Sequence, residues 1–157
     1  MKFKIYIESS IFSYLSARQS RDLVVAAHQQ ITTEWWHRQR HRFDLYVSEL
    51  VIQEISAGDP VAATKRLEFL IGIPSLILTE DVMSLAIALL NSQAVPQQAV
   101  EDAYHIATAT VHGMDFLVTW NCKHIANATL RNRIEQTCRN HDFEPPAILT
   151  LEQLLEE

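Results

Sequence analysis

Four side chains with oxygen ligands follow apolar stretches of the chain or lie on helices next to them: Glu8, Glu54, Asp102 and Asn121. Glu8 comes directly after the apolar run at residues 3–7, and Asn121 follows the run at residues 116–119. If both runs are parallel strands, their carboxyl ends meet at one edge of a sheet, where ligands bind in open α/β folds. The other two acids can reach the same edge from neighbouring helices. Because crowded carboxylates repel one another unless a hard cation joins them, the pattern predicts a metal-dependent site.

Taken one at a time, these residues have ordinary explanations. Glu8 and Asp102 each open a helical stretch, where the helix dipole favours an acid. Glu54 suits a solvated helix face, and Asn121 suits a loop. Asp102 nevertheless borders the predicted core face of its helix, so it does not simply face water. The joint pattern is the more informative observation, since all four side chains can face a single edge.

Histidines offer an alternative metal site. His37 and His41 are spaced i, i+4, as in a helical zinc clamp, but the arginines around them repel a cation, which favours a solvated basic face. His105 follows Asp102 by three residues and either lies near the site or is a hydrogen-bonded core histidine, and we favour the second. Asp115 precedes a predicted strand, which places it at the opposite edge of the sheet and excludes it from the site.

Apolar runs typical of short buried strands alternate with segments of helical periodicity. The predicted strands lie at residues 3–7, 43–47, 76–78, 116–119 and 147–149. The predicted helices run from the caps Ser9 and Ser10 to residue 15, over 23–42, from the cap Ser48 past Glu54, over 61–71, from the cap Thr79 to residue 90, over 98–112, over 126–138, and after the cap Thr150. This alternation implies βαβ units. We therefore expect a single α/β domain, residues 1–157, with a mostly parallel sheet of four or five strands flanked by helices.

Helical spacing also predicts which residues face the core. In the helix at 23–42 these are Val24, Ala27, Ile31 and Trp35. In the helix at 61–71 they are Leu67, Leu70 and Ile71. Trp35 and Trp36 are adjacent, so they are not both expected in one core. One of the two is expected in a dimer or partner interface.

Composition narrows the function further. The chain has 157 residues, an apolar content of 48% and a net charge of −6, which does not suit a protein that coats duplex nucleic acid non-specifically. No run approaches 18 apolar residues, and the N-terminus has no apolar signal region, so a cytoplasmic protein is expected. Cys122 and Cys138 lack the spacing of a zinc site and are expected to be free thiols in a reducing compartment.

Basic and aromatic residues near Asn121 are candidates for binding a substrate. Lys123 and His124 follow Asn121 by two and three residues and are the basic side chains best placed to grip a phosphate. Trp120 lies beside the proposed site and either stacks on a nucleobase or packs under the loop. For the other basic residues, ordinary solubility is the favoured explanation.

Four segments carry a resemblance to a known family: Tyr6–Ser10, Ser48–Ile55, Asp102–Ala107 and Leu117–Ile125. In their order and spacing they resemble PIN-domain proteins, and among these the VapC-like toxins of bacterial toxin–antitoxin pairs. The resemblance implies a PIN-like three-layer fold and a ribonuclease that depends on Mg²⁺ or Mn²⁺. It places the family's four acidic, metal-binding positions at Glu8, Glu54, Asp102 and Asn121, and its hydroxyl positions at Ser9 and Thr119.

Two of these positions depart from the family pattern. The family has Asp at the first and fourth acidic positions, where this chain has the longer Glu8 and the uncharged Asn121. An amide oxygen can still ligate a hard cation or hold a bound water. It carries no charge, so a second metal ion is expected to bind more weakly than in the family.

The favoured hypothesis is an endoribonuclease that hydrolyses RNA phosphodiester bonds and acts as the toxin of a toxin–antitoxin pair. It is expected to have an antitoxin-like protein partner and to form a homodimer. Two alternatives remain open. One is a catalytically weak or inactive PIN-like binding module paired with an antitoxin-like protein, and the other is a structure-specific DNA nuclease.

Overall fold

A five-stranded parallel sheet forms the centre of the protein. The computed structural model describes residues 1–155. The strands are β1 (Lys4–Ile7), β2 (Asp44–Ser48), β3 (Ser75–Leu76), β4 (Phe116–Val118) and β5 (Ala147–Leu149). Their order across the sheet is β3-β2-β1-β4-β5, and every pair of neighbours is parallel. The expected parallel sheet is confirmed, with five strands.

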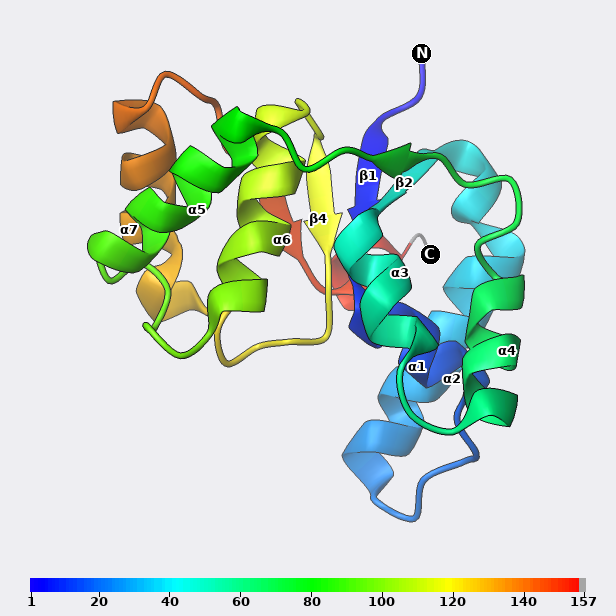
Figure 1. Cartoon of the computed structure of the whole chain (residues 1–157). Helices are drawn as coiled ribbons and strands as arrows, with labels where there is room; N and C mark the ends of the chain where they lie inside the picture. Colours follow the sequence, from blue (N-terminus) through cyan, green and yellow to red (C-terminus); the bar gives the residue numbers. More distant parts are fainter. Residues whose placement is uncertain (156–157) are drawn as a thin grey trace.

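Helices cover both faces of this sheet and give the expected three layers (Figure 1). One layer holds α1 (Ser9–Ser16), α2 (Leu23–Arg38), α3 (Glu49–Ser56) and α4 (Pro60–Glu68). The other holds α5 (Glu80–Asn91), α6 (Val100–Val111) and α7 (Ala128–Asn140). Two short 3-10 helices, η1 (Arg40–Arg42) and η2 (Leu151–Leu154), follow α2 and β5. In Figure 1 β1 and β4 run downward, so their carboxyl ends lie at the lower edge of the sheet.

Three of the predicted helix caps are present. The Ser48 hydroxyl accepts the N–H of Val51 at the start of α3, Thr79 caps α5, and Thr150 forms a capping box before η2. The predicted cap of α1 is wrong, because the N-cap residue is Glu8 and no side chain caps this end. The hydroxyls of Ser9 and Ser10, expected at the helix end, instead donate to carboxylates of the candidate site.

The predicted inner faces of α2 and α4 are partly wrong. Val24 is 63% exposed and Ala27 is also exposed, whereas Trp35 is buried as expected. Ile71 is 81% exposed because α4 ends at Glu68, which leaves Ile71 outside the helix. Periodicity gives the relative angles between side chains on a helix, but the neighbouring elements decide which stripe becomes the inner one.

Both adjacent tryptophans lie in the core, which corrects the expectation that one of them faces a partner. Trp35 and Trp36 are both buried. Trp35 stacks on Phe43 at 5.9 Å between ring centroids, whereas Trp36 packs edge-on against Phe12 of α1 and Phe69 after α4. The end of α2 is therefore covered on two sides within the chain, and the tryptophan pair gives no support for a dimer.

The cap of α5 makes a measurable contribution to stability. Thr79→Ala removes the acceptor for the Val82 N–H and is expected to lower the free energy of unfolding by about 1 kcal/mol, measured by urea denaturation. Ile77→Ala, at a 63% exposed position just before the cap, is the matched control and should stay within about 0.5 kcal/mol of wild type. Equal stability of Thr79→Ala and wild type would show that the cap does not stabilise α5.

Two further sequence expectations concern compartment. Cys122 and Cys138 are free thiols, as expected. Within residues 1–155, none of the helices has the length and apolarity needed to span a membrane.

Candidate metal centre at the carboxyl edge of the sheet

Glu8 occupies the centre of the carboxyl edge. It follows β1 directly, and its backbone N–H donates to the carbonyl of Val118 in β4, so the end of the strand fixes its position. The residue is only 6% exposed. Its Oε1 accepts hydrogen bonds from Thr119 Oγ1 at 2.5 Å and Ser10 Oγ at 2.6 Å. Among the described hydrogen bonds none reaches Oε2, which leaves this oxygen for another ligand.

Glu54 approaches Glu8 from α3. Its Oε1 accepts hydrogen bonds from Ser9 Oγ at 2.5 Å and from His105 Nε2 at 2.6 Å. Burial alone raises the pKa of the Glu54 carboxyl, but the hydrogen bond and charge of His105, together with Ser9, outweigh it and lower this pKa below its ordinary value. Glu54 is therefore held in its charged form, and its side chain is 32% exposed.

A buried row of hydrogen bonds supports Glu54 from behind. His105 Nδ1 lies 2.6 Å from the Tyr6 hydroxyl, which lies 2.8 Å from Ser48 Oγ. Because a carboxylate only accepts, His105 Nε2 must donate to Glu54. If His105 is neutral, its Nδ1 accepts from the Tyr6 hydroxyl, and the Tyr6 oxygen accepts from Ser48. If His105 is protonated, both of these hydrogen bonds reverse their direction. Either way every group in the row has a partner.

The charges around His105 and Tyr6 shift their ionisation. Burial lowers the pKa of the His105 imidazole, but the hydrogen bond to Glu54 and the nearby carboxylates of Glu8, Glu54 and Asp102 raise it overall. Burial raises the pKa of the Tyr6 hydroxyl, so Tyr6 stays protonated. The row is thus a network of protonated donors that ends on the Glu54 carboxylate.

Asp102 lies on the first turn of α6 and is bound by the loop after β4. Its Oδ1 accepts from Asn121 Nδ2 at 3.1 Å, and its Oδ2 lies 2.9 Å from His124 Nδ1. The Asn121 oxygen accepts the backbone N–H groups of Lys123 and His124, which fixes the orientation of the amide. Thr119 Oγ1 accepts the Asn121 N–H at 2.9 Å, so one hydroxyl links Asn121 to Glu8.

The structure brings the predicted residues to one edge in two connected groups. Ligand atoms of Glu8, Glu54 and His105 lie within 4.8 Å of one another. Asp102 is outside this cluster and joins it through Asn121 and Thr119. No Lys or Arg in residues 1–155 forms a salt bridge with Glu8 or Glu54, so two close carboxylates lack a counter-charge from a basic side chain other than histidine.

A hard divalent cation fits this donor set. Each of Glu8 and Glu54 uses one carboxylate oxygen for two hydroxyl or imidazole donors, which leaves the second oxygen for an ion. Mg²⁺ and Mn²⁺ prefer such oxygen ligands. The alternative zinc site at His37 and His41 is exposed. Within residues 1–155, the cluster of Glu8, Glu54 and His105 is the one group of three or more candidate ligands. His37 and His41 therefore have no third ligand beside them among these residues.

The residues proposed to bind substrate differ in their surroundings. Lys123 is exposed, and His124 is held by Asp102. Trp120 is 8% exposed, stacks on His28 with 4.2 Å between ring centroids, and donates from its indole N–H to Thr32. The indole therefore packs beneath the loop. Stacking on a nucleobase stays a prediction, and it requires this ring to become uncovered.

Sequence reasoning named the supporting residues Ser9 and Thr119 but missed the supporting roles of His105, Tyr6 and Ser10. His105 is fully buried and hydrogen-bonded, as the core-histidine alternative predicted, but one of its partners is Glu54 itself. Its i, i+3 spacing from Asp102 was the available signal. Tyr6 lies two residues before Glu8, so strand alternation places both on one face. For Ser10, nothing distinguished its side chain from a helix cap.

Comparison with known proteins shows similarity in structure. No family model and no curated protein matches the chain. A chain of the crystal structure of VapBC2 from Rickettsia felis, bound to a DNA fragment from their promoter, superposes with a TM-score of 0.56 at 12% sequence identity. The match covers 94% of this chain and 98% of the other. The PIN-like fold expected from the motifs is therefore confirmed, and the likeness to this toxin–antitoxin structure is a likeness of fold.

Proposed function

We propose that this protein is a Mg²⁺- or Mn²⁺-dependent endoribonuclease and the toxin of a toxin–antitoxin pair. The observation that supports this most strongly is the approach of the Glu8 and Glu54 carboxylates at the carboxyl edge of the sheet, with no Lys or Arg paired to either among the described residues. The fold shared with a chain of the VapBC2 structure supports the same assignment.

In the proposed mechanism Glu8, Glu54 and Asp102 would hold the ion, directly or through water, and Asn121 would contribute to the same site. The chemistry supplied by bound Mg²⁺ or Mn²⁺ is activation of a water and polarisation of the phosphate. The rest of the site orients these ligands: Ser9 fixes Glu54, Thr119 fixes Glu8 and Asn121, and Asn121 holds Asp102. Asn121 and Thr119 would orient the attacking water or the groups that hold the ion.

Groups beside the ligands are proposed to meet the substrate. Lys123 and His124 contact the phosphate, and Trp120 contacts a base. His124 would do this from its Nε2, because its Nδ1 lies 2.9 Å from Asp102. An antitoxin-like protein is the proposed partner. The fold that this protein shares with a chain of the VapBC2 structure supports the proposal. A homodimer and a cytoplasmic location belong to the same proposal.

Removal of the metal tests this function. The purified chain is expected to cleave single-stranded RNA with Mg²⁺ or Mn²⁺, to lose the activity in EDTA, and to regain it when Mn²⁺ is restored in excess. A DNA of the same sequence serves as the control and should remain intact. Cleavage that persists in EDTA would contradict the metal site, and preferential cleavage of DNA would support the DNA nuclease alternative.

The binding-module alternative also has a specific observation in its favour. Both oxygens of Asp102 are engaged, by Asn121 and His124, and Asn121 contributes no charge. In such a module, an arginine of an antitoxin-like partner would pair bidentately with the carboxylates. Isothermal titration calorimetry separates the two functions: no binding of Mn²⁺ at millimolar concentration would favour the module.

A further inference from the structure

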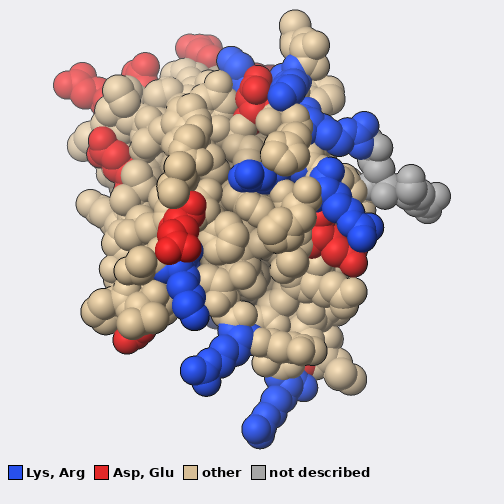
Figure 2. All heavy atoms as spheres, turned by 90° about the vertical axis from the view of Figure 1, so that its right-hand side faces the viewer, with Lys and Arg blue, Asp and Glu red and all other residues tan. Residues whose placement is uncertain are grey.

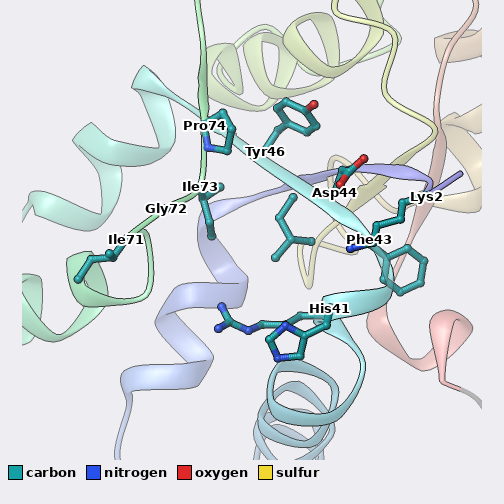
Figure 3. A pocket seen from close by; sticks show the side chains of 11 residues that line it. Lys2, His41, Phe43, Asp44, Tyr46, Ile71, Gly72, Ile73 and Pro74 are labelled. Atoms are coloured by element: carbon teal, nitrogen blue, oxygen red, sulfur yellow. The ribbon is translucent and has the colours of Figure 1, made fainter.

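A basic hollow lies beside the outer edge of β2, away from the Glu8 and Glu54 carboxylates. It has a volume of about 400 Å³, and its walls include Lys2, Arg40, His41, Tyr46 and Ile73 (Figure 3). Its lining follows β2 from Asp44 to Tyr46 and includes Lys2 just before β1, whereas Glu8 follows β1 at the carboxyl edge. The lining of the hollow includes none of the ligands of the candidate metal centre, which makes the two places separate sites.

The hollow exists because the sheet is incomplete there. β3 pairs with β2 only at Val47 and Ser48, so the outer edge of β2 at Asp44–Tyr46 is not covered by β3. The chain before β3 turns away at Gly72, whose φ of +83° is a left-handed conformation that suits glycine. Figure 3 shows this segment and β2 as the two sides of the opening.

The charge of the hollow is opposite to that of the whole protein. Lys2, Arg40 and His41 line it, with Asp44 as the acid among its lining residues, although the chain carries a net charge of −6. Lys and Arg side chains are prominent on this side of the molecule (Figure 2). The Arg40 guanidinium lies 4.8 Å from the ring centroid of the buried Trp36, an arrangement that holds the arginine in place while its edge can still donate hydrogen bonds.

The lining combines cations with aromatic and apolar surface. Besides the basic residues, Phe43, Tyr46, Ile73 and Pro74 contribute to the walls. A phosphate matches Lys2 and Arg40, because a guanidinium donates to phosphate oxygens in a fork and an ammonium adds a point charge. A planar base matches the rings and the Ile73–Pro74 wall. Both halves of a nucleotide therefore have partners in one hollow.

We infer that this hollow binds a nucleoside 5′-phosphate, either free or at the end of an RNA chain. Binding of an RNA 5′ end rests on the proposed ribonuclease function, since the hollow would then hold the substrate at a second place, remote from the bond that is cleaved. The free-nucleotide form is independent of catalysis. In both forms the phosphate is bound between Lys2 and Arg40, and the base packs against Phe43 or Tyr46.

Calorimetry of the full chain in EDTA tests the inference without any metal-dependent step. AMP is expected to bind saturably and at least about tenfold more tightly than adenosine, because the nucleoside lacks the charge-assisted hydrogen bonds. Lys2→Gln with Arg40→Gln should weaken AMP binding by about tenfold or more. The matched control is Arg21→Gln with Lys65→Gln, which removes the same charge at exposed positions outside the hollow and should bind AMP like wild type.

The single variant Lys2→Gln keeps the test valid if loss of Arg40 disturbs Trp36, because Lys2 is exposed and precedes the first strand. It should also weaken AMP binding while thermal unfolding is unchanged. Competition between AMP and a short RNA with a 5′-phosphate or a 5′-hydroxyl separates the two sources of the phosphate. Equal binding of AMP and adenosine, or unchanged AMP binding by the Lys2 and Arg40 variants, would overturn the inference. Because metal is absent, this failure is distinct from a failure of the ribonuclease proposal.

Discussion

Asp102→Asn is expected to abolish metal-dependent RNA cleavage, with a loss on the order of 10³-fold in kcat/KM. The substitution removes one of three carboxylates from the proposed ion shell but keeps the shape of the side chain. An asparagine at this position can still accept from the Asn121 amide, which bonds Oδ1 in the wild type at 3.1 Å. The first turn of α6 should therefore keep its place. Single-turnover cleavage of RNA with Mn²⁺, together with thermal unfolding, measures both effects.

Asp115→Asn is the matched control for this experiment. Asp115 lies at the opposite edge of the sheet, where its Oδ2 accepts the backbone N–H of Lys4 at 2.8 Å. The chemical change is the same, but it occurs away from the proposed ion, so cleavage should stay at the wild-type rate. Equal cleavage by wild type and Asp102→Asn would remove Asp102 from the mechanism and weaken the whole assignment.

The sequence predicted the position of the candidate site because backbone topology decides it. Glu8 and Asn121 follow β1 and β4, which are neighbours in the sheet, so any parallel pairing of these strands brings the two residues to one edge. Glu54 was predictable because the Ser48 cap fixes where α3 begins. These inferences need only strand direction, helix start points and chain order, which local patterns indicate.

The contacts between side chains were not predictable in the same way. His105 donates to Glu54, which is 51 residues earlier in the chain, and no local pattern states which elements become neighbours at that depth. The burial of Trp36 has the same origin, since it depends on Phe12 and Phe69 from two other helical segments. Asn121 was identified as a possible ligand, but its bond to Asp102 depends on how the loop after β4 meets α6.

His105→Phe is expected to weaken Mn²⁺ binding by about 10- to 100-fold, the usual effect of removing a residue that holds a metal ligand. Phenylalanine is a ring of similar shape and slightly larger volume, but it makes no hydrogen bond to Glu54 or to Tyr6. In the wild type His105 is bonded to each of these residues at 2.6 Å. His105→Gln keeps a donor and an acceptor on one side chain and should recover part of the affinity. Calorimetry with Mn²⁺ reports the effect directly, and kcat/KM for RNA cleavage should fall in parallel.

Thr110→Val separates this positioning role from a general loss of stability in α6. Thr110 is buried on the same helix, and its hydroxyl donates to the Ile106 carbonyl at 2.7 Å, away from the carboxylates. The variant loses a buried hydrogen bond but should bind Mn²⁺ like wild type. A double-mutant cycle with Tyr6→Phe adds a second criterion: because Tyr6 and His105 belong to one hydrogen-bonded row, their effects on metal affinity should not be additive. Additive effects, or wild-type Mn²⁺ affinity in His105→Phe, would mean that Glu54 is held without this row.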